Sequence, residues 1–353
     1  MTILAGKKVK PSRKVRLEDI AERCGVSLST VSRALAGEKG VSADIRAKVA
    51  EVARSLNYQV AASLAGRKVI LAASSAAMID YVRNQFTAHV LEGLHQRAET
   101  LSVEIVTQPV ASAAEDIGML RTAAADESVA GFLFLSLDDD DLLALTSGFG
   151  KPVVLINGED PLMRLSSVSP CNRSAAHMAT AYLQGLGHER ILFVMRRGRS
   201  TIERRLEGWR DAMLAQKISG ADDMVIVVED WLPELAAAAV EQRIASRKLD
   251  FTAILAAGES LAAGAMQAIS RAGYRVPDDV SVMGIDNLPQ AGFYNPPLTS
   301  IHVPMREIGA AALDLLFGAA SSLAGPAQRI ELACHIVERQ STAVAPRKRA
   351  GHL

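Results

Sequence analysis

The spacing of hydrophobic residues changes once along the chain, close to residue 68. Between residues 17 and 56 apolar side chains recur every three or four positions, which is the spacing of a helix with one buried face. This part therefore predicts a small head of three short helices. Gly25 permits a tight turn between the first two, and Ser27 and Ser42 are placed to cap the second and the third.

From Val69 onward, short apolar runs alternate with helical segments of 10–20 residues. We predict strands at "VILAAS", "VEIVT", "GFLFLS", "PVVLIN", "RILFVM", "MVIVVE", "TAILAA" and "VSVMGI". Apolar strands separated by helices are typical of parallel sheets that are covered on both faces. The eight strands divide into two successive units of four, so the expected fold class is α/β, with two doubly wound lobes. Ligands in such folds bind beyond the carboxyl ends of the strands.

Two later strands, at about residues 298–303 and 329–338, are expected on either side of a helix at about 307–318 and to complete the two lobes. The sequence thus predicts a disordered basic arm, a helical head, a linker, a double lobe and a disordered tail. The expected bounds are 1–14, 15–58, 59–68, 69–341 and 342–353. Within the double lobe we expect lobe one at 69–166 and 299–322, and lobe two at 167–298 and 323–341.

The charge of the chain is zero overall but unevenly distributed. Residues 1–68 contain 14 Lys and Arg against 6 Asp and Glu, whereas the remainder contains 25 against 33. A basic head on an acidic body suggests that the head binds a polyanion. Basic segments without such a partner are also common, so charge by itself leaves the partner open.

The second predicted helix carries small hydroxyl residues and one arginine on its polar side. A helix, a glycine turn and a second helix with an exposed polar face form a helix-turn-helix, whose second helix enters the DNA major groove. Hydroxyls bond phosphates there, and the guanidinium of Arg33 reaches guanine O6 and N7 with two donors. The alternative is that these residues are only the solvated face of a helical bundle.

The stretch "VRLEDIAERCGVSLSTVSRALAGEKGVSADIRAKVAEVARSLNY" resembles the DNA-binding head of the lactose repressor/galactose repressor family of bacterial transcription regulators. The resemblance continues through "GLGHERILFV", "RRLEGWRDAM", "VPDDVSVMGIDN" and "NPPLTSI", and covers about residues 15–340. It implies a periplasmic-binding-protein-like double lobe behind the head. It also implies base contacts by Leu28, Ser29 and Arg33, and phosphate contacts by Ser27, Thr30, Ser32 and Ser42.

The sequence departs from this family at the cap of the first helix, at the linker and at one ligand position. Arg16 stands where relatives carry a capping Thr or Ser, which costs about 1 kcal/mol or less. "LNYQVAASLAG" lacks the Pro-Asn of the family's hinge helix and is about three residues shorter. Leu64 is the candidate for the leucine that wedges into the minor groove, or else it packs against a lobe. Gly258 and Glu259 replace the usual Asn-Asp, so Glu259 either takes over an effector contact or only begins a helix.

The resemblance places an effector in the cleft between the lobes. Arg205 matches the arginine that contacts the ligand, and its guanidinium suits vicinal hydroxyls or a carbonyl. Asp286, at a strand end, matches the aspartate that accepts protons from hydroxyls or amines. Trp231 offers an indole face for a sugar ring, or it packs at a lobe edge, whereas Trp209 is expected in the core. On the first lobe the candidates are Ser74, Ser75 and Asp138, although "DDDD" also suits a solvated helix start.

Other classes of protein have little support in the sequence. The histidines show no metal-ligand spacing, and the chain has no nucleophile elbow, phosphate loop or dinucleotide fingerprint. "GHER" is interpreted as a turn that ends a helix. Cys24, Cys171 and Cys334 are odd in number and widely spaced, which fits ordinary buried thiols in a reducing compartment. We therefore expect that the protein is not an enzyme and needs no cofactor or metal. We also expect it to be cytoplasmic and without membrane contact.

The sequence as a whole predicts a ligand-responsive transcription regulator, most often a repressor in this family. It would bind a pseudo-palindromic operator as a homodimer, with a sugar or sugar derivative as effector. Two alternatives remain: a purine or nucleoside effector in the same fold, and a cytosolic small-molecule sensor that no longer binds DNA through its shortened linker.

Overall fold

The computed structural model describes residues 17–35, 40–55, 66–75, 78, 81–111, 113–137, 139–216, 221–321 and 326–346. By its internal contacts the chain divides into two compact units. The first comprises residues 1–67 and the short segment 101–103, and the second comprises the remaining residues.

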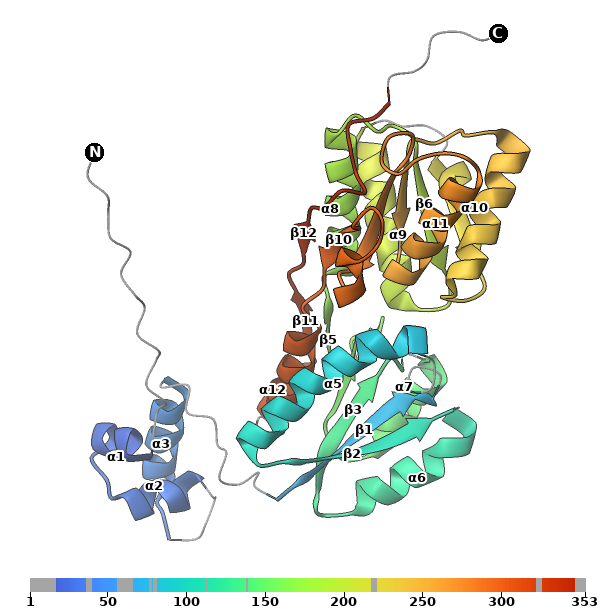
Figure 1. The fold of residues 1–353 in the computed structure, drawn as a ribbon. Coiled ribbons are helices and arrows are strands. Elements are labelled where there is room, and N and C mark those ends of the chain that lie inside the picture. The colour runs from blue at the N-terminus through green and yellow to red at the C-terminus, as the bar shows by residue number, and fades with distance from the viewer. Residues whose placement is uncertain are drawn as a thin grey trace, which may run out of the picture. The chain divides into compact units, whose positions relative to one another are not determined.

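The first unit contains the three predicted helices, α1 (Leu17–Cys24), α2 (Leu28–Leu35) and α3 (Ala43–Ser55) (Figure 1). Gly25 has φ of 68° in the turn between α1 and α2, a backbone conformation that residues other than glycine rarely adopt. The core of this unit is small, and its fully or nearly buried members come from all three helices: Ile20, Ala21, Cys24, Val31, Val49 and Ala53.

The second unit begins with a parallel six-stranded sheet in the order β11-β5-β4-β3-β1-β2. Its strands are β1 (Lys68–Ser74), β2 (Glu104–Val110), β3 (Val129–Leu135), β4 (Val153–Ile156), β5 (Ser166–Pro170) and β11 (Arg329–Leu332). Successive residues of a strand face opposite sides of the sheet. Phe132 and Phe134 belong to the cluster on the α6 (Ala113–Ala125) and α7 (Asp140–Leu145) side. Gly131 faces the other side, where α12 (Met305–Ser321) and α5 (Tyr81–Leu101) lie.

A second six-stranded sheet has the order β12-β10-β9-β8-β6-β7 and is parallel except for β12. Its strands are β6 (Ile191–Arg196), β7 (Val225–Val228), β8 (Ala253–Ala256), β9 (Ser281–Asp286), β10 (Thr299–His302) and β12 (His335–Val337). Its helices are α8 (Asn172–Gly185), α9 (Ser200–Ala215), α10 (Pro233–Arg247) and α11 (Glu259–Arg271). Short 3₁₀ turns occur in the first lobe after α7, at η1 (Thr146–Gly148), and in the second lobe before β7 and β10, at η2 (Ala221–Met224) and η3 (Pro289–Gly292). Trp209 is fully buried and stacks on Phe193, as expected of a core residue.

The predicted fold class is confirmed, but the late strands do not divide between the lobes as expected. Residues 299–302 were assigned to lobe one, yet β10 pairs with β9 in the second sheet. The segment 329–338 is not one strand, because β11 pairs with β5 in the first sheet and β12 with β10 in the second. Residues 166–170, which gave no strand prediction, form β5 in the first sheet. Which strands pair depends on which sheet edge is open, and the spacing of hydrophobic residues does not show which edge that is.

The chain therefore passes between the lobes three times, and we call these segments the crossovers. The first follows β5 at residues 170–172, the second joins β10 to α12 at 302–305, and the third joins β11 to β12 at 332–335. Each lobe is built from segments that are distant in sequence. Figure 1 shows these segments side by side between the two sheets.

The segment predicted to be a disordered tail, 342–353, includes residues that have a defined position in the structure. Residues 342–346 lie on the second lobe, where the Ala343 amide donates to Ser281 Oγ at 3.0 Å and the Ala345 amide to the Leu186 carbonyl at 2.8 Å. His188, from "GHER", is buried beneath this segment, and its Nε2 lies 3.0 Å from the Ala343 carbonyl oxygen. The sequence did not predict this position, because the contacts are made by main-chain groups and the side chains of the segment show no hydrophobic periodicity. Within the described part of the chain, every helix is too short or too polar to cross a bilayer.

Candidate functional site

The polar face of α2 is the candidate DNA-binding surface of the first unit. Val31 points into the helical core and is fully buried, whereas Ser29, Ser32 and Arg33 are exposed. Leu28 is also exposed, at 45% of its surface, although apolar side chains at such positions usually turn inward. An exposed leucine beside serines and an arginine gives a surface with both apolar and hydrogen-bonding groups, which suits contact with base edges in the major groove.

Ser27 and Ser42 perform the capping that the sequence predicted. Ser27 Oγ accepts the Thr30 amide at 3.2 Å, and Ser42 Oγ accepts the Ile45 amide at 3.4 Å. Thr30 is half-buried, and its hydroxyl lies 2.8 Å from Ser27 Oγ. These hydroxyls fix the N-termini of α2 and α3, whose free amides favour an anion such as a phosphate. Leu64, the candidate wedge residue, lies outside the described residues.

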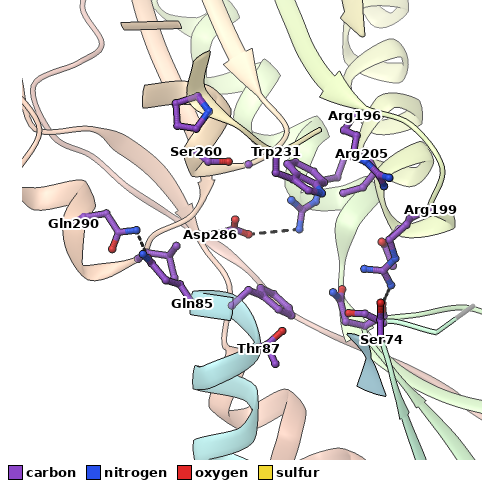
Figure 2. Close-up of a pocket in the computed structure, with 18 of the residues that line it drawn as sticks. Ser74, Gln85, Thr87, Arg196, Arg199, Arg205, Trp231, Ser260, Asp286 and Gln290 are labelled. Carbon is purple, nitrogen blue, oxygen red and sulfur yellow. Dashed lines mark hydrogen bonds and ion pairs between the residues drawn. The ribbon is translucent and has the colours of Figure 1, made fainter. Parts of the chain in front are cut away.

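A cavity of about 320 Å³ lies in the second unit between the two lobes (Figure 2). Its wall comes from both sheets and from the helices that follow their strands. The lining residues are Ser74, Gln85, Phe86, Thr87, Ser136, Asn157, Arg196, Arg199, Thr201, Ile202, Arg205, Trp231, Pro233, Gly258, Ser260, Asp286, Leu288, Gln290 and Tyr294. This position beyond the strand ends is where the fold predicts a ligand.

Arg205 and Asp286 face each other across the second-lobe side of the cavity (Figure 2). The Arg205 side chain is 5% exposed, and its Nη2 lies 3.7 Å from Asp286 Oδ1. Two further groups hold the guanidinium in place: Arg205 Nε donates to Asn172 Oδ1 at 2.8 Å, and Nη1 donates to the Ala257 carbonyl. The 3.7 Å ion pair is longer than a charged hydrogen bond, so both groups retain capacity to bond a ligand.

Burial shifts the acid–base properties of this pair. Desolvation raises the pKa of Asp286 to about 6, against the opposing effect of the Arg205 charge. It also lowers the pKa of the Arg205 guanidinium, an effect that the Asp286 carboxylate opposes. Each charge therefore stabilises the ionised form of the other. The pair supplies one fixed fork of donors and one acceptor to the cavity.

Trp231 packs on Gly258 at the edge of the same wall. A Cβ atom at Gly258 would lie 2.9 Å from Trp231 Cζ3, which is closer than a carbon–carbon contact permits. Gly258 has φ of −161°, so the glycine is required by the approach of the indole and not by backbone strain. The half-buried indole thus occupies space that a larger residue at position 258 would take, and it still borders the cavity.

Glu259 lies behind the cavity wall and does not line it. Its side chain is 1% exposed, Oε2 accepts the Leu288 amide at 2.8 Å, and Oε1 has no hydrogen-bond partner among the described residues. Desolvation raises its pKa to about 8, so this carboxyl is mainly protonated at neutral pH. The structure therefore favours the second alternative for Glu259, which begins α11 and does not line the cavity.

The first-lobe candidates are less well placed. Ser74 lines the cavity, whereas Ser75 does not, and Asp138 lies outside the described residues. Sequence reasoning missed Ser136, Asn157 and Arg196, although each stands at or directly after the end of a predicted strand, and this signal was available. Other lining residues, such as Phe86 near the start of α5, needed the tertiary structure to be found.

Hydrogen bonds join the two lobes at the rim of the cavity. Arg199, at the start of α9, donates to the carbonyl of Asn157 in the first lobe. Gln290 of η3 donates to Gln85 Oε1 of α5, as the dashed lines in Figure 2 indicate. Arg204 Nε donates to Glu159 Oε2 of the first lobe at 3.2 Å. The lobes therefore close over the cavity through polar contacts, which a change in their separation would break.

Comparison with known proteins gives matches over both units. Residues 16–60 match the family model "Bacterial regulatory proteins, lacI family", and residues 180–342 match "Periplasmic binding protein-like domain". The chain is 30% identical to the transcriptional regulator reg1 of Streptomyces lividans, over 95% of this chain and 98% of the relative. It is 26% identical to the ribose operon repressor of Haemophilus influenzae, over 85% and 90%.

Solved structures agree with these matches. A complex of the transcriptional regulator CelR with cellobiose is 27% identical, has a TM-score of 0.70, and aligns over 93% of this chain and all of that one. The lac repressor dimer bound to operator and an anti-inducer is also 27% identical, has a TM-score of 0.67, and aligns over 94% of this chain and all of that one.

Proposed function

Because the chain belongs to the lacI family of bacterial regulatory proteins, we propose that it represses transcription from a pseudo-palindromic operator and that a small molecule in the inter-lobe cavity controls this binding. The helical unit is the DNA-binding part, and the double lobe is the sensor. A homodimer in the cytoplasm is the form in which two heads would reach two half-sites.

The DNA-binding role of the head is supported by exposure and charge. Leu28, Ser29 and Arg33 are exposed on α2 and would read base edges, with the Arg33 guanidinium directed to guanine. Ser27, Thr30, Ser32 and Ser42 would lie near phosphates, in addition to the caps that Ser27 and Ser42 provide. The net charge of +8 over residues 1–68 would attract the duplex from a distance.

The observation that carries the effector proposal is the wall formed by Arg205, Asp286 and Trp231 around a cavity of about 320 Å³. A fork of donors, an acceptor and an indole face suit a ring with vicinal hydroxyls on its edge and an apolar face. We infer that the effector is a sugar or sugar derivative. The relatives solved with cellobiose, and at 20% identity with ribose, bind such compounds.

A purine or nucleoside is the second candidate. Phe86 from the first lobe and Trp231 from the second both line the cavity, and aromatic side chains on two sides suit a flat heterocycle. Relatives named PurR are 25–28% identical to this chain. Asp286 and the amides of Gln85 and Asn157 offer acceptors and donors for ring nitrogens.

Ligand binding would change DNA affinity through the separation of the lobes. Filling the cavity alters contacts such as Arg199 to Asn157 and Gln290 to Gln85, which join the two lobes at its rim. A ligand shifts the balance of open and closed forms only by as much as its affinity differs between them. Coupling between such sites is typically about 1–3 kcal/mol.

A selection from a randomised duplex pool tests the DNA-binding half of the proposal. Purified full-length protein, with and without a mixture of sugars and nucleosides, is expected to enrich an inverted repeat. Failure to enrich any sequence under either condition would favour the alternative of a sensor that does not bind DNA.

A thermal-shift screen with single sugars, polyols and nucleosides tests the effector half. A ligand that binds only the folded protein increases the free energy of unfolding, by about 2.7 kcal/mol at 100 times its Kd, and so raises the melting temperature. Arg205→Ala is expected to abolish the shift while operator binding persists. Arg271→Ala, which removes an exposed arginine paired to Glu241 on the same lobe, is the control; an equal shift in the Arg205 variant and the control would exclude Arg205 from the binding site.

A further inference from the structure

Two of the three cysteines meet at the crossovers between the lobes. Cys171 follows β5 in the first crossover, and Cys334 lies between β11 and β12 in the third. Both are free, and they are 163 positions apart in the sequence. They are far apart in the sequence, as expected, but the pairing of β5 with β11 brings them together in the structure.

Main-chain hydrogen bonds fix the approach of these two residues. The Cys171 amide donates to the Leu332 carbonyl at 3.0 Å and continues the ladder between β5 and β11. The Cys334 amide in turn donates to Cys171 Sγ at 3.4 Å. The Cys334 Sγ donates to the Leu332 carbonyl at 3.8 Å, the same carbonyl that accepts the Cys171 amide. Both cysteines therefore lie beside the end of β11.

The two thiols differ in environment in the way that a reactive pair requires. The neighbouring Cys334 side chain lowers the pKa of Cys171, whereas the Cys171 side chain and burial raise the pKa of Cys334. Cys171 is half-buried and Cys334 is 6% exposed. A thiolate with access to solvent reacts with oxidants first, so Cys171 is the attacking thiol and Cys334 the resolving one.

We propose that Cys171 and Cys334 are an oxidation site for peroxides, and that the disulfide between them ties the first crossover to the third. The Cys171 thiolate attacks one oxygen of hydrogen peroxide, the O–O bond breaks, and hydroxide leaves, which gives a sulfenic acid. The Cys334 sulfur then attacks the Cys171 sulfur, the S–O bond breaks, and water leaves with the Cys334 proton. The two cysteines lose two electrons, and the peroxide gains them.

The position of this disulfide connects it to the effector cavity. Asn172 directly follows Cys171, and its Oδ1 accepts the hydrogen bond from Arg205 Nε at 2.8 Å. Lobe movement requires backbone rotation in the crossovers. A covalent tie between two of the three restricts that rotation, so oxidation limits lobe movement whichever effector the cavity binds.

Peptide mapping of the full-length protein tests the site. The native protein is treated with graded hydrogen peroxide, its remaining thiols are alkylated, and it is digested without reduction. A cross-linked peptide pair containing Cys171 and Cys334 is expected, with the loss of two hydrogens, while Cys24 stays alkylatable. In Cys334→Ser a sulfenic acid at residue 171 is expected to be trapped by dimedone; in Cys171→Ser no corresponding adduct is expected at residue 334.

Hydrogen exchange tests the consequence for the crossovers. Amide exchange at the non-proline residues of 170–172, 302–305 and 332–335 is expected to slow after oxidation and to return to its initial rate on reduction. Cys171→Ser and Cys334→Ser are each expected to show no effect of peroxide on amide exchange, which separates the disulfide from general oxidation damage. Absence of the cross-linked peptide in native protein, or its formation without any change in exchange at the crossovers, would overturn the proposal.

Discussion

Arg33 and Glu259 show how burial decides what a charged residue contributes. Arg33 is exposed on α2, and its Nε donates to the Ser29 carbonyl of its own helix at 3.3 Å. Glu259 is 1% exposed and mainly neutral at neutral pH. The first residue is therefore suited to contact a partner, whereas the second affects the stability of the fold.

Replacing Arg33 is expected to reduce sequence discrimination. Arg33→Ala removes a bidentate contact with guanine and should cost about 1–3 kcal/mol at one position of the operator, with little change in non-specific affinity. Competition binding of operator and mutated duplexes measures this difference. Arg23→Ala, at an exposed arginine of α1, is the control with the same charge change. A uniform loss of affinity for all sequences in Arg33→Ala would remove Arg33 from base reading.

Glu259 is expected to make stability depend on pH. Its pKa rises from 4.5 to about 8 on folding, so the folded protein binds the proton more tightly than the unfolded chain. Its contribution is fully present below pH 4.5 and is lost as the pH rises to about 8, by up to about 1.4 kcal/mol per pH unit.

Urea denaturation of wild type and Glu259→Gln across this range measures the effect, because glutamine keeps the shape without the titration. The difference in unfolding free energy between the two proteins should change in favour of Glu259→Gln as the pH rises. Glu234→Gln, at an exposed residue in the first turn of α10, is the control for the substitution itself. Parallel pH profiles for wild type and Glu259→Gln would contradict the raised pKa.

At the scale of elements, the contact between α5 and α12 sets the first-lobe wall of the cavity. A Cβ at Gly93 would lie 2.0 Å from the Arg306 carbonyl oxygen, and a Cβ at Gly309 would lie 2.1 Å from the Val90 carbonyl oxygen. The two helices therefore approach until each glycine meets the other backbone. Because α5 begins with cavity-lining residues such as Gln85, any displacement of this helix moves the wall.

Gly93→Ala is expected to destabilise the protein and to weaken effector binding. The added methyl has no space beside the Arg306 backbone, and overpacking of this kind typically costs about 1–3 kcal/mol. Gly118→Ala on α6 is the matched control, because no atom lies within 4 Å of its Cβ position, and alanine should stabilise that helix by about 0.5–1 kcal/mol. Thermal melts with and without effector compare the two, and equal stability of both variants would contradict the close approach.

At the scale of the whole molecule, the chain consists of two units with separate hydrophobic cores. The core of the helical unit contains few side chains, so this unit has a small margin of stability. The double lobe contains two six-stranded sheets and is far larger. A regulator with this construction can bind DNA with one unit while the other responds to a small molecule.

The full-length protein is accordingly expected to unfold in two calorimetric transitions. An effector should raise only the transition of the double lobe, and operator duplex should raise mainly that of the helical unit, since each binds a different folded part. Differential scanning calorimetry with each ligand separately measures this. A single cooperative transition, shifted equally by both ligands, would contradict independent units.

Much of the fold and part of the site followed from local patterns. The helices of the head, the eight principal strands and the buried Trp209 were predicted, because hydrophobic spacing records which face of an element is buried. Relatives that are transcription regulators confirm the prediction of a regulator and not an enzyme. Arg205 and Asp286 were expected at the cleft from the family resemblance, and Trp231 from its position just past a strand. All three line the cavity, whereas Ser75 does not; their effector contacts stay predictions.

The sequence by itself determined which segments are helices and strands, which faces they bury, and which end of each sheet carries polar groups, since these depend on neighbours within a few positions. Only the tertiary structure decided where β10 and β11 pair, that Cys171 meets Cys334, and that Glu259 is removed from water. These features arise between residues far apart in the chain. Their physical origin is the pairing of sheet edges and the exclusion of solvent by both lobes, which no local pattern of residues records.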